Sequence, residues 1–287
     1  MSDPFLITGP AVISFSGGRT SAYMLWRILQ SHGGKLPDDV VVCFANTGRE
    51  MPATLDFVWD CGAVWNVPIA WLEHRRDDDG APSTVEVSHN SASRNGEPFE
   101  AILGVRPMLP NPTVRYCTIE LKIRTVKRHI VSTFKWKRWT NVVGLRADEP
   151  RRVVKATDPE KNKKDRWDVL CPLSTAGIEE IDVLRFWRSQ PFDLRLKGAW
   201  EGNCDGCFLK SRARLERMWL DHPDRMAWWS KIEESRVGMK TKTIDARKFR
   251  SDREDYKTMG STIRDQGRLS FDINDIDIPC EDAGCGV

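Results

Sequence analysis

The chain contains no long apolar run, because none of its 287 residues falls in a stretch that approaches the roughly 18 consecutive apolar residues needed to span a bilayer. Its N-terminus also lacks the basic start and apolar run that are typical of a signal peptide. The formal net charge is only +3, so overall charge does not indicate a nucleic-acid or membrane-surface partner. We therefore expect a cytoplasmic protein that has no membrane partner.

Histidine is also scarce. The five histidines are scattered, and none is paired with a cysteine or an acidic residue at a metal-binding spacing. Hydrophobic residues make up 40% and charged residues 30% of the chain, which is typical of a globular protein large enough to fold without disulfides. In a cytoplasmic protein we expect the eight cysteines to be thiols, metal ligands or redox groups.

Short apolar runs alternate with segments of helical periodicity in the first half of the chain. The pattern predicts strands at residues 12–15, 40–45, 67–72 and 140–145, and helices at 20–30, 54–65 and 119–134. Further helices are predicted at 178–189 and within 209–234, where Pro223 divides two of them. The alternation predicts an α/β fold with a parallel sheet and flanking helices.

Composition divides the chain into three predicted parts. Residues 1–175 form a nucleotide-binding α/β domain, in which the polar residues 75–98 are an insertion or flap. Residues 176–237 form a helical part that carries cysteines, and 238–287 an irregular tail. Residues 151–168 are predicted to be a charged loop, with Val153 and Val154 as a short edge strand.

The loop between the first predicted strand and helix has the composition of a phosphate site. Its glycines allow a tight turn that brings backbone N–H groups close to a ligand, and the helix N-terminus that follows attracts anions. Hydroxyl groups and one guanidinium add further donors. The residues are Ser16, Gly17, Gly18, Arg19, Thr20 and Ser21.

Six segments in sequence order resemble the motifs of the phosphoadenosine phosphosulfate (PAPS) reductase family. This family belongs to the PP-loop, or adenine nucleotide alpha-hydrolase-like, superfamily, and the branch resembled is one seen in bacterial and phage genomes. The segments are residues 16–21, 45–50, 115–122, 144–152, 171–173 and 202–210. The resemblance covers about residues 11–235 and implies that this superfamily's fold is present.

The resemblance implies that the nucleotide is ATP or PAPS. Asn46, Thr47 and Gly48 would contact the adenosine, and Gly144 and Arg146 would close the other side of the site. A guanidinium suits an anionic ligand, although Arg146 could instead belong to a solvated cluster with the acidic residues that follow it. PP-loops often carry Lys-Asp where this chain has Arg-Thr, which leaves cleavage of ATP open.

Cys204 and Cys207 have a spacing that suits either a metal or a redox dithiol. In the iron–sulfur branch of the family, cysteines at these positions and at Cys117 hold a four-iron (4Fe-4S) cluster. That branch has two adjacent cysteines at the first position, whereas Cys117 is followed by threonine. We expect Cys280 to be the fourth ligand, with Cys171 as a weaker candidate, zinc as the alternative metal, and unligated thiols as the remaining alternative.

Cys285 lies in a terminal Cys-Gly segment. The resemblance implies that this thiolate is the catalytic nucleophile that attacks the sulfur of the nucleotide; a second metal-ligand role and an end without a role are the alternatives. We therefore expect a PAPS reductase-like oxidoreductase or sulfurtransferase that uses a thiol reductant or sulfur donor.

Two other functions are compatible with the sequence. One is an ATP-dependent PP-loop enzyme that activates a nucleic acid for sulfur transfer, resembling the DNA phosphorothioation branch of the superfamily. The basic segments 122–128 and 135–139 would then contact the nucleic acid, although solvated helix faces have the same composition. The other is a nucleotide-binding protein without catalytic turnover.

Overall fold

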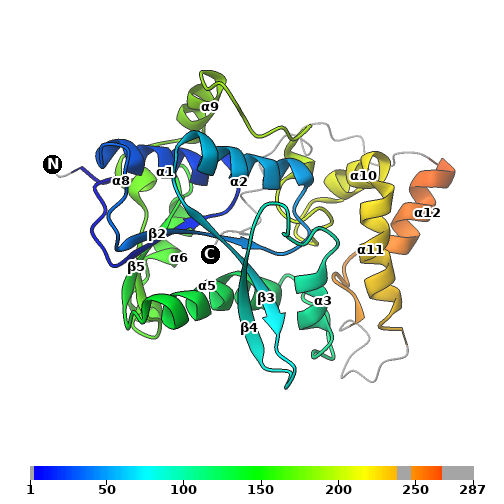
Figure 1. Cartoon of the computed structure of the whole chain (residues 1–287). Coiled ribbons are helices and arrows are strands. Elements are labelled where there is room, and N and C mark those ends of the chain that lie inside the picture. The colour runs from blue at the N-terminus through cyan, green and yellow to red at the C-terminus, as the bar shows by residue number, and fades with distance from the viewer. Residues whose placement is uncertain (1–2, 238–246, 267–287) are drawn as a thin grey trace.

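Six strands form one sheet in the order β4-β3-β2-β1-β5-β6 (Figure 1). The computed structural model of the chain describes residues 3–237 and 247–266. The strands are β1 (Ala11–Phe15), β2 (Val40–Asn46), β3 (Ile69–Arg76), β4 (Pro82–Val87), β5 (Trp139–Val143) and β6 (Trp167–Leu170). All neighbouring strands are parallel except β3 and β4, which are antiparallel. The predicted α/β fold with a mainly parallel sheet is therefore confirmed.

The order of the sheet reverses direction at β1. The chain passes from β1 to β2 and β3 on one side, and then crosses to β5 and β6 on the other. Ala11 is accordingly paired with Val40 of β2 and with Thr140 of β5. In an open parallel sheet, such a switch point leaves a crevice outside the carboxyl ends of the two central strands.

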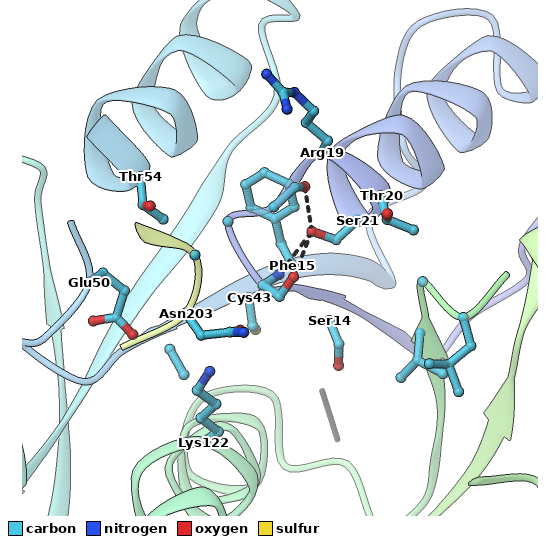
Figure 2. Close-up of a pocket in the computed structure, with 18 of the residues that line it drawn as sticks. Ser14, Phe15, Arg19, Thr20, Ser21, Cys43, Glu50, Thr54, Lys122 and Asn203 are labelled. Atoms are coloured by element: carbon cyan, nitrogen blue, oxygen red, sulfur yellow. Dashed lines mark hydrogen bonds between the residues drawn. The ribbon is translucent and has the colours of Figure 1, made fainter. Parts of the chain in front are cut away.

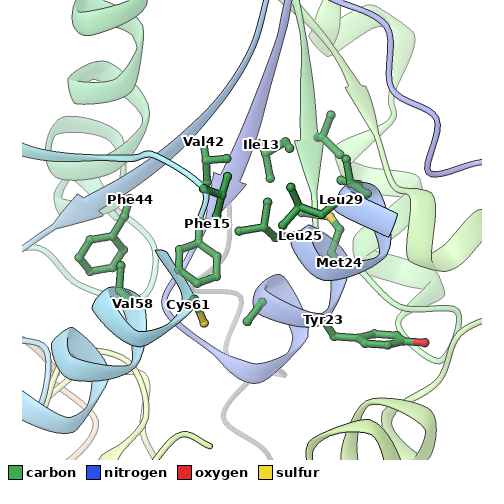
Figure 3. Packing of buried hydrophobic residues seen from close by; sticks show 14 of the residues in the cluster. Ile13, Phe15, Tyr23, Met24, Leu25, Leu29, Val42, Phe44, Val58 and Cys61 are labelled. Atoms are coloured by element: carbon green, nitrogen blue, oxygen red, sulfur yellow. The ribbon is translucent and has the colours of Figure 1, made fainter. Parts of the chain in front are cut away.

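Helices cover both faces of the sheet because the central strands are apolar on both sides. On one face, Ile13 and Phe15 pack against α1 (Arg19–Ser31) and α2 (Pro52–Val64), as Figure 3 shows. On the other face, Val12 and Cys43 pack against the helical segment 116–134. That segment consists of α4 (Tyr116–Thr118), η1 (Ile119–Ile123), α5 (Arg124–His129) and η2 (Ile130–Phe134), where η1 and η2 are π-helical.

A second, mainly helical cluster lies beside the carboxyl ends of the strands. It is built around buried side chains such as Phe208, Trp229, Phe249 and Tyr256. Its helices are α3 (Glu97–Leu103), η3 (Ala199–Glu201), α10 (Arg212–Asp221), α11 (Pro223–Glu234) and α12 (Tyr256–Gln266). The remaining helices are α6 (Pro150–Ala156), α7 (Pro159–Asn162), α8 (Pro172–Thr175) and α9 (Glu180–Arg188). Cys117 and Cys204 pack against this cluster, whereas the glycine-rich loop lies at the sheet.

Two details of the predicted secondary structure are wrong, and one strand was missed. Residues 150–156 are helical, because Pro150 suits the first helical position and Val153 packs beside Leu145 and Cys171, so Val153 and Val154 form no edge strand. The edge strand at residues 82–87, within the predicted insertion or flap, was not predicted, since an edge strand with little buried surface gives no apolar alternation. Helix α12 lies inside the segment predicted to be irregular. The three predicted parts of the chain remain predictions.

In the described ranges 3–237 and 247–266, no helix is both long enough and apolar enough to cross a membrane.

Candidate nucleotide and cysteine site

A cavity of about 510 Å³ opens at the carboxyl ends of β1 and β5, where the order of the sheet reverses (Figure 2). All six residues of the loop 16–21 line it, and so do Gly144 and Arg146. The volume lies in the range of small-molecule and cofactor sites. The structure thus brings these eight residues, which the sequence predicts to bind a nucleotide, to one cavity.

Gly17 and Ser21 set the conformation of the loop. Gly17 has a φ of 81°, and a Cβ at this position would lie 2.9 Å from Cγ2 of Thr54, so both the backbone angle and the space favour glycine. The Ser16 backbone N–H donates to the Ser21 hydroxyl at 3.2 Å, and that hydroxyl donates to the Gly18 carbonyl oxygen at 3.0 Å. Gly18 is the N-cap of α1, a helix of 13 residues. The backbone N–H groups of the first turn of this helix, which have no partner within the helix, therefore lie at the cavity.

Gly144 and Arg146 form the opposite wall. A Cβ on Gly144 would lie 3.2 Å from the Ser21 Cα, so β5 approaches α1 closely only because residue 144 is glycine. Arg146 is 4% exposed and its Nη1 donates to Thr20 Oγ1 at 3.3 Å. It also forms an ion pair with Asp148 at 2.9 Å. The sequence allowed Arg146 either a place in the nucleotide site or a place among acidic neighbours. In the structure it lies in the cavity wall and also contacts acidic neighbours.

Arg19 forms an ion pair at the rim of the cavity. Its Nε and Nη2 donate to the Asp193 carboxylate at 2.7 and 2.8 Å, and its Nη2 also donates to the Leu194 carbonyl oxygen at 3.1 Å. Figure 2 places its guanidinium on the side of the loop away from Ser14 and Lys122. These contacts join α1 to the segment after α9, and the predicted role of Arg19 in phosphate binding stays a prediction.

Asn46, Thr47 and Gly48 make contacts within the protein. The Asn46 Nδ2 donates to Glu73 at 2.6 Å and to the Ser93 carbonyl oxygen at 2.9 Å, and its Oδ1 accepts from the Gly48 N–H at 3.1 Å. On this strand the cavity is lined by Cys43 and Ala45, and then by Glu50 after the strand ends. The predicted contacts of residues 46–48 with adenosine stay predictions.

Several lining residues are not among those predicted from the sequence. Ser14 and Asn141 are polar residues inside mostly apolar strands, and this interruption of the apolar pattern is the sequence signal that could have identified them as lining residues. Lys122 and Asn203 stand inside the two motifs that contain the candidate ligand cysteines. The additional residues that line the cavity and carry polar groups include Ser14, Glu50, Thr54, Lys122, Asn141 and Asn203.

A second cavity, of about 30 Å³, is lined by all three of the cysteines predicted as ligands in the described part of the chain, Cys117, Cys204 and Cys207. Lys122 and Asn203 line both cavities and so form a shared wall. Thr47 also lines the smaller cavity, and its Oγ1 lies 3.4 Å from the Cys204 Sγ. The nucleotide-site candidates and the cysteines are therefore neighbours.

The cysteine cavity meets the requirements of a metal centre only in part. Its three thiols are the donors that an iron–sulfur cluster or zinc takes. Within the described ranges, however, no three histidine, cysteine, aspartate or glutamate side chains are arranged so that they could hold a metal ion. Donor chemistry thus fits a cluster, whereas the described residues do not by themselves complete a ligand set.

Cys280 and Cys285 lie outside the described residues, as does everything from residue 267 onward. Cys171, the weaker ligand candidate, packs with Val143 and Leu145 away from the other thiols. Burial raises the pKa of Cys171 to about 11 and that of Cys43 to about 12, so both are thiols at neutral pH. Cys171 lines neither of the two cavities.

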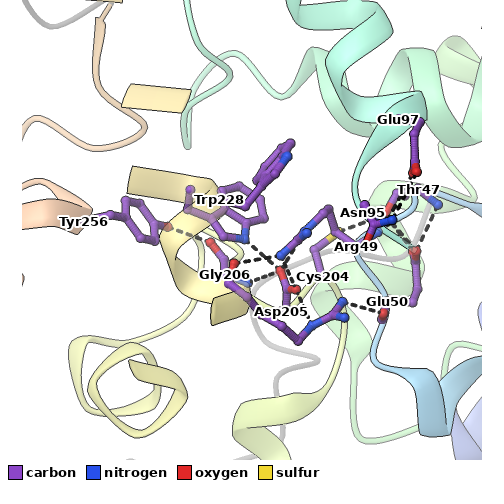
Figure 4. Close-up of polar contacts among 12 residues, drawn as sticks. Thr47, Arg49, Glu50, Asn95, Glu97, Cys204, Asp205, Gly206, Trp228 and Tyr256 are labelled. Carbon is purple, nitrogen blue, oxygen red and sulfur yellow. Dashed lines mark hydrogen bonds and ion pairs between the residues drawn. The ribbon is translucent and has the colours of Figure 1, made fainter. Parts of the chain in front are cut away.

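The Cys204–Cys207 loop is anchored by a buried carboxylate (Figure 4). Asp205 is fully buried and accepts from Arg49 Nη2 at 2.6 Å, Arg225 Nε at 2.7 Å and Trp229 Nε1 at 2.7 Å. The Asp205 N–H donates in turn to the Arg49 carbonyl oxygen at 2.9 Å. The cysteine loop is thus attached to the segment that follows β2, one residue before Glu50 in the wall of the larger cavity.

Comparison of the sequence with known proteins places it beside a phage protein. No family model matches the chain. The uncharacterized nin region protein ORF290 of Escherichia phage lambda is 31% identical over 209 residues, which cover 71% of this chain and 67% of that protein. The chain belongs to the family of this lambda protein.

Among solved structures, the chain is similar to the U34-tRNA thiolase NcsA from Methanococcus maripaludis with its [4Fe-4S] cluster. Sequence identity is 14%, the match covers 81% of this chain and 74% of that chain, and the TM-score is 0.41. A likeness of this size carries no information about activity.

Proposed function

We propose that this member of the lambda ORF290 family is a PP-loop enzyme that binds an adenine nucleotide and carries out sulfur chemistry beside it. The observation that carries the proposal is the shared wall: Lys122 and Asn203 line both the loop cavity and the cysteine cavity. A group at the end of a nucleotide held by the loop would therefore lie next to the thiols. A plain strand–helix turn would not require this arrangement.

The loop 16–21 would bind the phosphate or sulfate end of the nucleotide. Backbone N–H groups at the start of α1 are directed to the cavity, and the positive end of the helix dipole favours an anion there. Arg146 would bind an oxyanion from the opposite wall, where its acidic neighbours Asp148 and Glu149 fix the guanidinium in position. ATP and PAPS both carry an anionic end of this kind.

Cys117, Cys204 and Cys207 would hold a [4Fe-4S] cluster together with Cys280, with zinc as the alternative metal. Support comes from the donor chemistry of the smaller cavity and from the resemblance to PAPS reductases. A bound cluster would supply a redox-active centre. Asp205 would keep the two loop cysteines in place through its contacts with Arg49 and Arg225.

In the reductase form of the proposal, the Cys285 thiolate attacks the sulfur of PAPS. An S–S bond forms, the S–O bond to the phosphate breaks, and adenosine 3′,5′-bisphosphate leaves. A thiol reductant then attacks the cysteine sulfur of the S-sulfonate, so that sulfite leaves with the electron pair of the S–S bond. A second thiol resolves the resulting mixed disulfide and restores the Cys285 thiol, so that two thiols become one disulfide.

One observation favours a second candidate, ATP-dependent activation of a nucleic acid. Lys122 and Lys127 line the larger cavity, and Arg124 of the same helical segment is exposed beside them. A basic segment that reaches from the surface to the cavity suits a polyanionic acceptor. In this form an acceptor oxygen attacks the α-phosphate of ATP and pyrophosphate leaves; the sulfur of a donor then attacks the adenylated acceptor and AMP leaves with that oxygen.

Product analysis tests the two forms. The full chain, purified anaerobically, is incubated with PAPS plus a thiol reductant, and separately with ATP. Sulfite that disappears in Cys285→Ser supports the reductase form, and pyrophosphate supports the second candidate. Tight nucleotide binding without either product contradicts an enzyme and supports a nucleotide-binding protein. No nucleotide binding at all overturns the proposal.

Metal analysis tests the cysteine site. Iron and acid-labile sulfide in the anaerobic protein, both lost in Cys204→Ser, would support the cluster. Zinc with no iron would instead assign the alternative metal. A Cys171→Ser variant is the matched control, because Cys171 is a buried thiol outside the cysteine cavity.

A further inference from the structure

Ser14 and Asn141 form a polar pair on an otherwise apolar face of the sheet. The Ser14 hydroxyl donates to Asn141 Oδ1 at 2.8 Å. Both residues lie on the face that packs against the helical segment 116–134, where their neighbours are Val12, Trp139 and Trp167. Both also line the larger cavity, so its inner end extends from the loop along this face of the sheet.

The Asn141 amide has bonding capacity that faces this cavity. The residue as a whole is 9% exposed. Among the residues the structure describes, its only side-chain hydrogen bond is the one its oxygen accepts from Ser14, so its NH₂ group has no protein acceptor. Because Asn141 lines the cavity, this NH₂ group is available to donate to a ligand bound there.

We infer that Ser14 and Asn141 are the subsite for the base of the nucleotide, and that they select adenine. This inference rests on the proposed function. The Asn141 NH₂ would donate to a ring nitrogen of the base. The Ser14 oxygen, whose proton is used in the bond to Asn141, would accept from an exocyclic amino group next to that nitrogen.

The walls around the pair suit a planar aromatic ligand. Ile123 and Val126 come from the helical segment, and Trp139 and Trp167 come from β5 and β6 with ring centroids 5.3 Å apart. A planar heterocycle can bury its faces against these side chains, and Lys127 Nζ, 6.0 Å from the Trp167 ring centroid, adds a positive charge to the same wall. Ser14 precedes Ser16 by two residues, about 6.5 Å along a strand, so one ligand can reach both ends.

Adenine matches this pair of donor and acceptor through its 6-amino group and the adjacent ring nitrogen, and guanine in the same orientation does not. Adenine presents an amino donor beside a ring-nitrogen acceptor, whereas guanine presents a carbonyl acceptor where adenine has the amino group. A guanine carbonyl facing the Ser14 oxygen would leave two acceptors opposite each other. A site whose buried polar groups must be paired discriminates strongly against a ligand that leaves them unpaired.

The test measures binding of ATP, GTP and inorganic tripolyphosphate to the full chain by calorimetry. For Asn141→Leu, which keeps the volume and removes the amide, ATP affinity should fall by about tenfold while tripolyphosphate affinity stays the same. Ser14→Ala should reduce the preference for ATP over GTP. The matched control is Thr140→Val, on the same strand but with its side chain on the opposite face and outside the cavity.

The outcomes separate this inference from the proposed function. If the wild type binds ATP and Asn141→Leu binds it equally well, the base subsite is wrong and the nucleotide site stands. Equal affinity of the wild type for ATP and GTP would also overturn the subsite. If the wild type binds tripolyphosphate but no adenine nucleotide, or none of the three, the proposed function fails and the inference fails with it. Unchanged melting temperatures in the variants show that they are folded.

Discussion

At the scale of single residues, two adjacent glycines of the loop have different requirements. Gly17 needs a positive φ, and a methyl group on its Cα would contact Thr54, Phe44 and Val58, whereas Gly18 has an ordinary φ of −102°. The nearest heavy atom to a Cβ on Gly18 is the Ser16 Oγ, at 3.7 Å. Only the first glycine is therefore demanded by the backbone conformation and the packing.

Gly17→Ala should weaken nucleotide binding by about tenfold or more, because a left-handed conformation costs an L-residue about 1–2 kcal/mol and the methyl group would also displace Thr54. Gly18→Ala is the matched control and should bind nearly as well as the wild type. Calorimetry with ATP measures both. Equal losses in the two variants would show that the loop conformation is not what the binding depends on.

At the scale of elements, buried charges join segments that are distant in the sequence. Asp205 joins the cysteine loop to Arg49 after β2 and to Arg225 of α11. His74 of β3 accepts a hydrogen bond at Nδ1 from Arg128 of α5 at 2.9 Å, which requires a neutral imidazole. Asp205 and His74 are each held by partners from other elements of the fold. Asp205 thereby fixes the position of the cysteine loop, and His74 fixes β3 against α5.

Asp205→Asn should destabilise the fold by about 3–5 kcal/mol, since it leaves the buried Arg49 without its carboxylate. Denaturant unfolding measures the change, and faster alkylation of Cys204 in the folded state would show that the cysteine loop has loosened. The control is Asp168→Asn, whose partner Arg138 is exposed and whose loss should change stability little. Equal stability of both variants would contradict the anchoring role.

His74 should make the protein less stable at mildly acidic pH. Burial, and then the Arg128 guanidinium, lower the pKa of His74 from 6.5 to about 4. The unfolded chain therefore binds a proton between these pH values that the folded chain does not, and stability falls as pH drops from about 6.5 towards 4. Comparing thermal unfolding of the wild type and His74→Gln across this range isolates the contribution. Parallel pH profiles would contradict it.

At the scale of the whole molecule, the sheet and the helical cluster meet at the wall shared by the two cavities. Lys122 comes from the segment that packs under the sheet, and Asn203 comes from the loop before Cys204. These parts are far apart in sequence. Because they meet, the candidate nucleotide-binding residues and the three thiols lie in one region of the molecule. Neither segment of sequence would indicate this proximity by itself.

Bound ATP should therefore slow the alkylation of Cys117 and Cys204, because a ligand in the larger cavity would restrict movement of the shared wall. Mass spectrometry of iodoacetamide-treated protein, from which metal has been removed, measures each cysteine separately. Gly17→Ala should lose this protection, and buried Cys171 should react slowly with or without ATP. Protection of Cys171 together with the other two would indicate global stabilisation instead.

Comparison of the predicted and observed elements shows where local sequence was sufficient. Residues 40–45 are apolar throughout and residues 12–15 are apolar except for Ser14, so burial on both faces could be predicted, and the helices on either side of Pro223 follow from the proline. The edge strand Pro82–Val87 and helix α6 are each covered on one face only, so the apolar periodicity in their sequences is weak. Such elements are decided by the partner against which they pack.

The sequence alone determined the mainly parallel sheet, and it was enough to predict residues 16–21 as a phosphate-binding loop and to name the candidate ligand cysteines, because these depend on composition and short-range spacing. Only the tertiary structure decided that Arg19 pairs with Asp193, that Asn46 bonds to Glu73, and that Ser14 and Asn141 face the cavity. The physical reason is distance along the chain: a side chain's partner is set by packing between segments up to 176 residues apart, and local pattern carries no information about it.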